Sequence, residues 1–222
     1  MRIIFRKDEH GNIISSFDYF MNCKIPKNKK ILDIGCGYAI LLFNLYKNGY
    51  KEVRGIETNK ERLKIGQKEY KKIKNKLFIY EGKKLPFRDN SFDVVLMFDV
   101  IEHIPKIEEF LKNEVYRILK KEGLFIFQTP NKLLNIPWEI FNNRSLVRWK
   151  SYHCSLQTYR SLRNIINLAG FRELKIEKWN IKTEHNLERL SRKVGLLATP
   201  TLYVISLLPI KLFSNFFGIA VK

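Results

Sequence analysis

Cysteine is scarce in this chain of 222 residues. The three cysteines, Cys23, Cys36 and Cys154, are far apart and form no CxxC pair. Their spacing excludes a disulfide framework and a zinc cluster, and it favours a reducing, cytoplasmic setting. The opening stretch, MRIIFRKDEHG, lacks the apolar segment of a secretory signal peptide, so we expect no secretion.

Acidic side chains are also few, with 22 Asp and Glu against 41 Lys and Arg, and the formal net charge is +19. A concentrated positive charge attracts RNA, anionic lipid or acidic substrates. Here the charge is spread, because residues 151–222 hold 11 basic and 4 acidic side chains and a net +12 lies in residues 1–150. Two interpretations stay open: a Lys-rich surface that keeps the protein in solution, or a polyanionic partner.

Long apolar runs suited to a membrane span are absent as well. The uncharged stretch VGLLATPTLYVISLLPI, at 194–210, contains Gly195, Pro200 and Pro209, so it is a poor candidate for a straight spanning helix. Before it, leucines recur at helical spacing with basic residues between them. For residues 185–215 we keep two interpretations: a segment that lies in a membrane interface, and a buried lid or dimer face.

Short apolar runs alternate with amphipathic stretches through most of the chain. The predicted strands are 30–35, 52–58, 76–80, 91–100, 123–129 and 171–179, and the predicted helices are 38–48, 60–74, about 106–120 and about 155–169. A further helix over 12–24 is expected to lie over the edge or the mouth of the sheet. Strands that alternate with helices predict an α/β fold of the Rossmann-like, doubly wound type.

The first predicted strand runs into the turn ILDIGCG, in which Asp33 precedes Gly35 and Gly37. Glycines at this place let a ligand approach the free backbone N–H groups at the start of the next helix. A dinucleotide fingerprint would have its third glycine where Ile40 stands, and no Gly-Lys-Ser/Thr sequence follows for a Walker loop. The turn therefore predicts a different ligand.

Acidic residues stand at the ends of three successive predicted strands: Asp33, Glu57 and Glu81. Asp33 suits a ligand with an ammonium and a sulfonium group, S-adenosylmethionine, and Glu57 is placed to accept hydrogen bonds from both ribose hydroxyls. We expect Glu81 to face the adenine amino group, Gly82 to offer a backbone N–H and Leu85 to form an apolar wall. Each acid alone could equally cap a helix or a turn, but the three together predict an S-adenosylmethionine site.

Motifs that support this cofactor span about residues 28–180: ILDIGCGYA, GIETN, EGKKLPFRDNSFDVV, FDVIEHIP, RILKKEGLFIFQTPN and HCSLQTYRSLRNIINLAGF. In order and spacing they are similar to class I S-adenosylmethionine-dependent methyltransferases. The chain resembles in particular the branch that includes ubiquinone-type O-methyltransferases. Ala39 stands where many members have a third glycine, and Glu81 stands where aspartate is usual.

The resemblance implies a seven-stranded, mostly parallel sheet. Its last strand, FFGIAVK at 216–222, would lie antiparallel beside the fifth strand and pair with the strand at 171–179. The resemblance also implies that the cofactor site includes Gly35, Cys36, Gly37, Thr58 and Phe98. We expect one domain over 1–222, with a helical cap (1–27), a cofactor-binding core (28–180), an apolar helical insertion (181–215) and the final strand (216–222).

Two histidines are candidate catalysts. Because the cofactor supplies the electrophilic carbon, the protein mainly aligns the acceptor and removes its proton. His103 follows the fourth predicted strand, at the sheet edge where open α/β folds bind ligands, and an imidazole pKa of about 6.5 suits a base. His153, before the helix at 155–169, is a candidate acceptor-side group. The alternative for both is a structural contact at a helix start.

The same strand end raises the alternative of a divalent metal, since carboxylates and imidazoles are metal ligands. The candidate ligands are Asp99, Glu102, His103 and the distant His153. The pattern is similar to that of small-RNA 2′-O-methyltransferases, which use a metal to hold a terminal ribose. That family begins the motif with glutamate and adds a nearby histidine, whereas His10 and His185 are remote in this sequence. We therefore predict no metal.

Nucleobase methylation is disfavoured. Amino-methylating enzymes carry an Asn/Asp-Pro-Pro-aromatic turn after the fourth strand, where this chain has FDVIEH. A cytosine-C5 enzyme needs a cysteine nucleophile there, and neither Cys36 nor Cys154 fits.

The function we favour is O-methylation of a small or lipid-linked acceptor. The first alternative is a 2′-O type RNA methyltransferase, for which positive charge should gather around His103 and His153, interleaved with Trp149 and Tyr152. The second alternative is a non-catalytic module that binds the cofactor or contacts a membrane. The sequence does not fix the oligomeric state.

Overall fold

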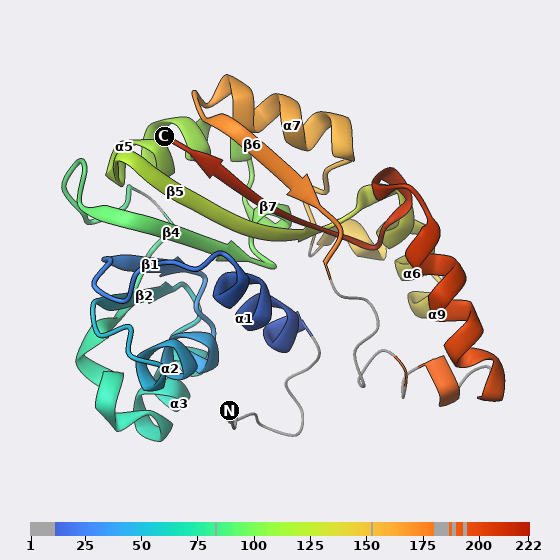
Figure 1. Ribbon diagram of the computed structural model, residues 1–222, viewed down its shortest axis with the longest axis horizontal. Helices are drawn as coiled ribbons and strands as arrows, with labels where there is room; N and C mark the ends of the chain where they lie inside the picture. The colour runs from blue at the N-terminus through green and yellow to red at the C-terminus, as the bar shows by residue number, and fades with distance from the viewer. Residues whose placement is uncertain (1–11, 83, 152, 180–186, 188–189, 193–194) are drawn as a thin grey trace.

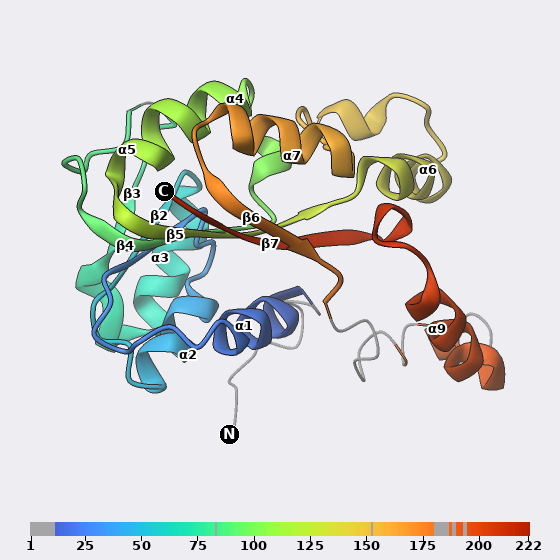
Figure 2. The same ribbon diagram turned by 45° about the horizontal axis from the view of Figure 1, so that its top comes forward.

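Figure 1 shows the computed structural model of the chain, which describes residues 12–82, 84–151, 153–179, 187, 190–192 and 195–222. Seven strands form one sheet in the order β3-β2-β1-β4-β5-β7-β6. Helices cover both faces of this sheet (Figure 2). The predicted α/β, Rossmann-like, doubly wound fold is confirmed.

The strands are β1 (Ile31–Ile34), β2 (Val53–Glu57), β3 (Leu77–Ile79), β4 (Phe92–Phe98), β5 (Leu119–Pro130), β6 (Arg172–Glu177) and β7 (Asn215–Val221). The first five pair in parallel with their neighbours. The last strand, β7, pairs antiparallel with both β5 and β6, as the resemblance implied. Parallel strands bring their carboxyl ends to one edge of the sheet, and this edge carries the candidate site.

One face of the sheet is covered by α4 (Ile107–Phe110), α5 (Tyr116–Ile118) and α7 (Tyr159–Leu168), which lie above it in Figure 2. Fully buried side chains from these helices and their connections pack on the sheet residues Phe125 and Phe127. They include Leu111, Val115, Ile118, Leu162 and Ile166. Removing such aliphatic surface from water is the main stabilising contribution of this layer.

The other face is covered by α1 (Asn12–Asn22), α2 (Ile40–Lys47) and α3 (Lys60–Glu69). The predicted leading helix is thus observed, and it lies beside the β6–β7 part of the sheet. The Tyr19 hydroxyl donates a hydrogen bond to Glu177 of β6 (3.1 Å), and its ring contacts Trp179 and Phe217 at centroid distances of 5.0 and 5.1 Å.

Some boundaries differ from those predicted. The single helix expected over about 106–120 is α4, a π-helical turn η3 (Leu111–Val115) and α5, and the chain then passes directly into β5 at Leu119. The helix expected over 60–74 ends at Glu69 and continues as a 3-10 turn, η1 (Lys71–Lys76). A helix that the sequence analysis missed, α6 (Lys132–Asn143), follows β5 and contains Pro137.

The expected insertion between the last two strands is helical where the structure describes it. It contains a 3-10 turn η5 (Gly195–Leu197), helix α9 (Ala198–Leu207) and a 3-10 turn η6 (Ile210–Leu212). Among the helices that the structure describes, none combines the length and the apolar character needed to cross a membrane.

Candidate functional site

The glycine turn after β1 is anchored to β2. The N–H groups of Gly35 and Cys36 both donate to the carbonyl of Ile56, at 2.8 and 3.0 Å. Gly35 has a φ of +75°, and a Cβ at this position would lie 2.5 Å from a methyl group of Val100. The turn therefore needs glycine at position 35 for both its backbone conformation and its contact with the segment after β4.

Two further positions of the turn have left-handed backbone. Gly37 has a φ of +54°, and a Cβ there would meet no atom within 4 Å, so its backbone faces open space. Ala39 has a φ of 64° and precedes α2 without a side-chain cap. This left-handed φ explains why many members of the family have glycine at the position of Ala39, because residues with a Cβ are strained in this conformation.

The Glu57 carboxylate joins the ends of β1 and β2. One oxygen accepts a hydrogen bond from the Gly37 N–H (2.8 Å), and the other accepts from the Asn59 N–H (2.8 Å) and the Thr58 hydroxyl (3.2 Å). Glu57 is buried, so these charge-assisted bonds are shielded from water. They fix the direction of the carboxylate at the strand tip.

Asp33 is a buried carboxyl group in the same region. Burial, together with the charge of Glu57, raises the pKa of Asp33 well above its ordinary value. Within the part of the chain that the structure describes, no hydrogen bond to the Asp33 carboxylate is found. A cationic group placed beside it would lower this pKa and stabilise the charged form.

A cavity of about 210 Å³ lies at the carboxyl edge of the sheet. Its lining residues come from the ends of β1, β2 and β3 and from the segment after β4: Ile34, Gly35, Ile56, Glu57, Thr58, Tyr80, Gly82, Val100, His103, Ile104, Pro105 and Phe110. The cavity thus brings together five of the predicted site residues, Gly35, Glu57, Thr58, Gly82 and His103. Gly82 has a φ of +76°, and a Cβ there would meet nothing within 4 Å.

The other predicted cofactor residues do not line this cavity as the structure has it. Asp33, Cys36 and Leu85 are buried, Gly37 and Phe98 are half-buried, and Glu81 is exposed. Burial, with the charges of Asp33 and Glu57, also raises the pKa of the Cys36 thiol, which therefore stays protonated.

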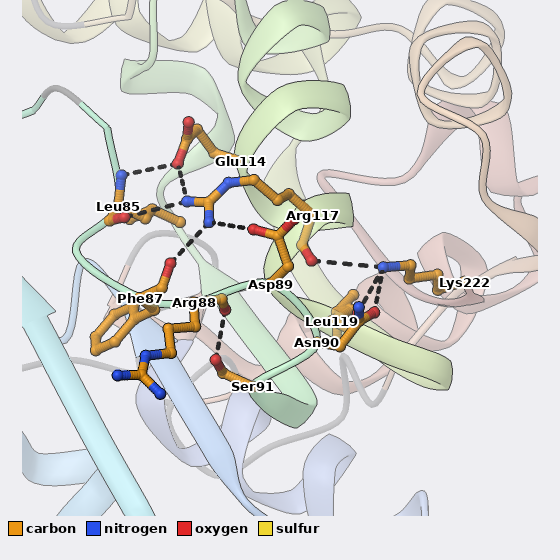
Figure 3. A network of polar contacts seen from close by, with 10 residues as sticks. All are labelled: Leu85, Phe87, Arg88, Asp89, Asn90, Ser91, Glu114, Arg117, Leu119 and Lys222. Atoms are coloured by element: carbon orange, nitrogen blue, oxygen red, sulfur yellow. Dashed lines mark hydrogen bonds and ion pairs between the residues drawn. The ribbon is translucent and has the colours of Figure 1, made fainter.

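Leu85 is held by a polar network at the loop between β3 and β4 (Figure 3). Its N–H donates to Glu114 (2.8 Å) and its carbonyl accepts from the Arg117 guanidinium (3.1 Å). The same guanidinium donates to Glu114 and Asp89, at 2.8 and 2.9 Å. The network fixes a loop that would otherwise be free to move, and with it the apolar side chain of Leu85.

The turn after β4 is fixed by the neighbouring strand. The Asp99 N–H donates to the Gln128 carbonyl (3.1 Å), and the Gln128 side chain donates back to the Asp99 carboxylate (2.8 Å). Asp99 has a left-handed φ of 54°. The chain then enters a 3-10 turn, η2 (Ile101–His103), which directs Glu102 inward and His103 outward.

His103 and His153 lie side by side, with ring centroids 5.0 Å apart. The contact depends on backbone pairing, because the Ser155 N–H donates to the Glu102 carbonyl (2.9 Å) and so brings the segment of His153 onto η2. Burial and the nearby charge of His103 lower the pKa of His153. The imidazole of His153 is therefore mostly neutral at neutral pH and able to accept a proton.

Glu102 completes the group beneath the two rings. Burial and the charge of Asp99 raise its pKa to about 8, although the Thr129 hydroxyl donates to its carboxylate (3.0 Å). The ligand atoms of Glu102, His103 and His153 all lie within 4.8 Å of one another. Such a set can pass protons, and it is also one that could hold a divalent cation. The structure does not include Asp99 in this set, and His10, Tyr152 and His185 lie outside the described residues.

The sequence analysis missed part of the apolar lining. Tyr80 is buried at the end of β3, and Val100, Ile104 and Phe110 come from the segment that follows β4. Tyr80 directly precedes the predicted Glu81, and Ile104 belongs to the motif FDVIEHIP. The apolar lining could therefore have been predicted from its place in the sequence beside the polar candidate residues.

Comparisons with known proteins identify methyltransferases among the proteins to which this chain is similar. A family of methyltransferase domains matches residues 32–127. The ubiquinone biosynthesis O-methyltransferase of Pelagibacter ubique is 32% identical over 140 residues, which are 62% of this chain and 58% of that protein. The demethylmenaquinone methyltransferase of Lactobacillus johnsonii is 27% identical over 157 residues, 63% of this chain and 64% of that protein. The chain spans less than two thirds of the length of these curated relatives.

A solved structure shows the same fold. The Haemonchus contortus phosphoethanolamine N-methyltransferase 2 in complex with S-adenosyl-L-methionine has a TM-score of 0.67 at 17% identity, and the match covers 94% of this chain and 52% of that chain. At this identity the likeness concerns the fold alone.

Proposed function

We propose that the protein transfers a methyl group from S-adenosylmethionine to an oxygen of a small or lipid-linked acceptor. The match of residues 32–127 to a family of methyltransferase domains supports this activity. The observation that carries the proposal is the shared cavity: Glu57 and Gly82 line it together with His103. A group that binds a ribose and a group that accepts a proton thus face one enclosed space, as in-line transfer requires.

The residues of the glycine turn fit the cofactor. Open space in front of Gly37 and Gly82 leaves room for a ligand against the backbone. The Glu57 carboxylate is held rigidly and suits two ribose hydroxyls. Asp33 suits the ammonium group because burial and the charge of Glu57 disfavour its ionised form, which a cation beside it would stabilise. When bound, S-adenosylmethionine supplies a methyl carbon that its sulfonium already activates.

The histidine pair supplies the base in this proposal. His103 lines the cavity, so it is the group that takes the proton from the acceptor hydroxyl. His153 lies against it and, because burial and the charge of His103 lower its pKa, stays neutral and able to accept a hydrogen bond from the His103 ring. General base catalysis of this kind contributes roughly 10²–10⁴ in rate.

The names of two relatives, a ubiquinone biosynthesis O-methyltransferase and a demethylmenaquinone methyltransferase, support a small-molecule acceptor. The RNA alternative required positive charge around the histidine pair. Glu102, whose raised pKa of about 8 keeps it largely protonated at pH 7, and Glu139 lie beside the pair, while residues 132–150 hold four basic side chains and one acidic side chain. Local charge therefore does not decide against RNA, and we keep the small or lipid-linked acceptor on the names of the relatives.

The test is an extract-labelling experiment. The protein is incubated with methyl-labelled S-adenosylmethionine and a total cell extract, which is then divided into lipid, small-molecule and RNA fractions. We expect label in the lipid or small-molecule fraction, in a bond that has the stability of an ether or ester. Label in RNA would overturn the acceptor class, and calorimetry without cofactor binding would overturn the enzyme.

A further inference from the structure

Exposed apolar side chains gather at one end of the molecule. Among the residues that the structure describes, fifteen large apolar side chains are exposed, and eleven of them lie in 133–147 and 187–212. These eleven are Leu133, Leu134, Leu146, Val147, Leu187, Leu196, Leu197, Tyr203, Val204, Leu207 and Leu212. We call the part formed by α6, residues 144–147, η5, α9 and η6 the apolar end. Exposed apolar side chains that gather at one end of a molecule are typical of an interaction site.

The apolar end lies at the carboxyl edge of the sheet. In Figures 1 and 2, α6 and α9 both stand at the end of the molecule that is farthest from α3. The Asn131 side chain, at the start of α6, donates to the carbonyls of Lys211 and Phe213 (2.8 and 2.7 Å). The Lys178 ammonium donates to the carbonyls of Ser206 and Leu208 at the end of α9, both at 3.1 Å. The two helices are thus fixed to the sheet on either side of this end.

Positive charge accompanies the apolar surface. Residues 132–150 contain four basic side chains and one acidic side chain, and the charged residues that the structure describes within 178–212 are the basic Lys178, Arg192 and Lys211. The exposed leucines of η5 and α9 are therefore flanked by Arg192 before them and Lys211 after them, with no charge between 194 and 210. An apolar surface with cationic flanks is the composition of an element that lies in the headgroup region of an anionic bilayer.

We propose that the apolar end docks on the surface of an anionic lipid membrane. The ten residues of α9 give a helix of about 15 Å, half the roughly 30 Å of a bilayer's hydrocarbon core, so it lies in the interface and does not cross. Leu196 is 99% exposed and Leu197 is 66% exposed, so both are available to insert between acyl chains.

Charge complementarity favours lipid over the other occupants. A second copy of this chain would bring an equally basic surface into contact, and the like charges would repel each other. Binding of single-stranded RNA without sequence preference combines positive charge with aromatic side chains on which the bases stack, whereas ten of the eleven exposed side chains are aliphatic. Anionic lipid matches both the charge and the aliphatic surface.

The surface adjoins the candidate site. Glu139 of α6 is close enough to raise the pKa of His153, so the apolar end begins beside the histidine pair. An acceptor with a long apolar chain would then reach His103 while its chain stays in the bilayer. The delivery of the acceptor to His103 rests on the proposed function, whereas the docking of the apolar end on a membrane does not.

Vesicle flotation with the full chain tests the docking. We expect the protein to float with vesicles of phosphatidylcholine and phosphatidylglycerol, and much less with phosphatidylcholine alone. A Leu196→Ser, Leu197→Ser double variant should lose about tenfold or more in partitioning, because two exposed leucines no longer leave water. Lys211→Glu should weaken binding to the anionic vesicles only.

Leu168→Ser is the matched control, since Leu168 is 52% exposed at the end of α7, away from the apolar end. It should bind vesicles like the parent, and thermal unfolding of each variant shows whether it folds. Equal partitioning of the parent and the double variant, or equal binding to both lipid mixtures, would overturn the proposal. The proposal would also be overturned if sedimentation velocity showed the parent to be a dimer and the double variant to be a monomer. That result would assign the surface to contact with a second copy of the chain.

The outcome is separable from that of the proposed function. Glu57→Ala should lose cofactor affinity and still bind vesicles, and the Leu196→Ser, Leu197→Ser variant should bind the cofactor like the parent. A protein that binds anionic vesicles but no cofactor supports the docking and refutes the enzyme, and the reverse result refutes the docking alone.

Discussion

The carboxylate of Glu57 accepts a hydrogen bond from the N–H of Gly37 across 2.8 Å and so joins the turn after β2 to the glycine turn after β1. The two residues are 20 positions apart in the chain, yet their pairing builds one rigid rim of the cavity. The same carboxylate orders the start of α3 through Asn59. We therefore expect both ligand binding and local order to depend on this one side chain.

Replacing Glu57 with alanine should weaken S-adenosylmethionine binding by about 1–3 kcal/mol, because charge-assisted hydrogen bonds are lost. Isothermal titration calorimetry measures the change. Glu57→Gln keeps the shape and loses the charge, so it should fall between the parent and alanine. Glu52→Ala, at an exposed position before β2, is the control and should bind normally. Unchanged affinity in Glu57→Ala would show that the ribose is held elsewhere.

Gly35 and Gly82 form a matched pair, with φ values of +75° and +76°. Alanine costs about 1 kcal/mol of stability at either position because of the left-handed backbone. At position 35 the added Cβ also meets Val100 at 2.5 Å, which should raise the loss to about 3 kcal/mol. Urea unfolding should therefore rank Gly82→Ala above Gly35→Ala in stability.

The second half of this test is a rescue. Val100→Ala should recover part of the stability that Gly35→Ala loses, whereas it should do nothing for Gly82→Ala. In contrast, Gly82→Ala should reduce cofactor affinity, because its backbone faces the cavity. Equal losses of stability at the two positions would mean that the contact with Val100 carries no energy.

Local patterns predicted the elements that surround the candidate site. The strands β1, β2 and β4 and the turn at Gly35 and Gly37 were found from short apolar runs that end in glycine or acid, which are signals within a few residues of sequence. The antiparallel position of β7 was implied by the family resemblance and is confirmed by its pairing with β5. These features need little information from the rest of the chain.

The features that local patterns could not predict depend on distant contacts. The proximity of His103 and His153 rests on a backbone bond between Ser155 and Glu102, residues that are 53 positions apart. Helix α6 was missed because Pro137 interrupts its pattern. The π-helical turn η3 was missed because it preserves the apolar spacing of an ordinary helix over most of its length. Each of these is decided by tertiary packing.

Asp33→Asn should make the protein more stable and less able to bind its cofactor. The pKa of Asp33 is raised in the folded state above the unfolded value of about 3.9, so between these two values the folded protein keeps a proton that the unfolded chain has lost. The free energy of unfolding then falls as pH rises, by at most about 1.4 kcal/mol per unit from this group. Asparagine does not titrate, so the variant should lack this decrease in the free energy of unfolding with rising pH.

Urea unfolding at several pH values above 4 should thus show a flatter profile for Asp33→Asn and a higher free energy of unfolding at pH 7. Asp93→Asn is the control, because its expected effect on the free energy of unfolding at pH 7 has the opposite sign. Although partial burial opposes it, the Lys30 N–H and the Lys120 ammonium lower the pKa of Asp93, so its loss should destabilise the protein at pH 7. Cofactor affinity by calorimetry should drop for Asp33→Asn alone, and an unchanged affinity would remove Asp33 from the ammonium site.

The last prediction separates a base from a metal ligand at the histidine pair. His103→Ala should keep the cofactor and lose about 10²–10⁴ in methyl-transfer rate, since it removes the proton acceptor that lines the cavity. His153→Asn should shift the pH dependence of the rate, because it removes a titrating ring that lies against His103 and whose pKa is lowered by burial and by the charge of His103. A chelator at high concentration should leave the parent rate unchanged, in line with the prediction that no metal takes part. The opposite outcome is that the chelator abolishes activity and that a divalent cation restores it in the parent but not in Glu102→Gln. In that case Glu102, His103 and His153 bind a metal, and the proton must leave by another route.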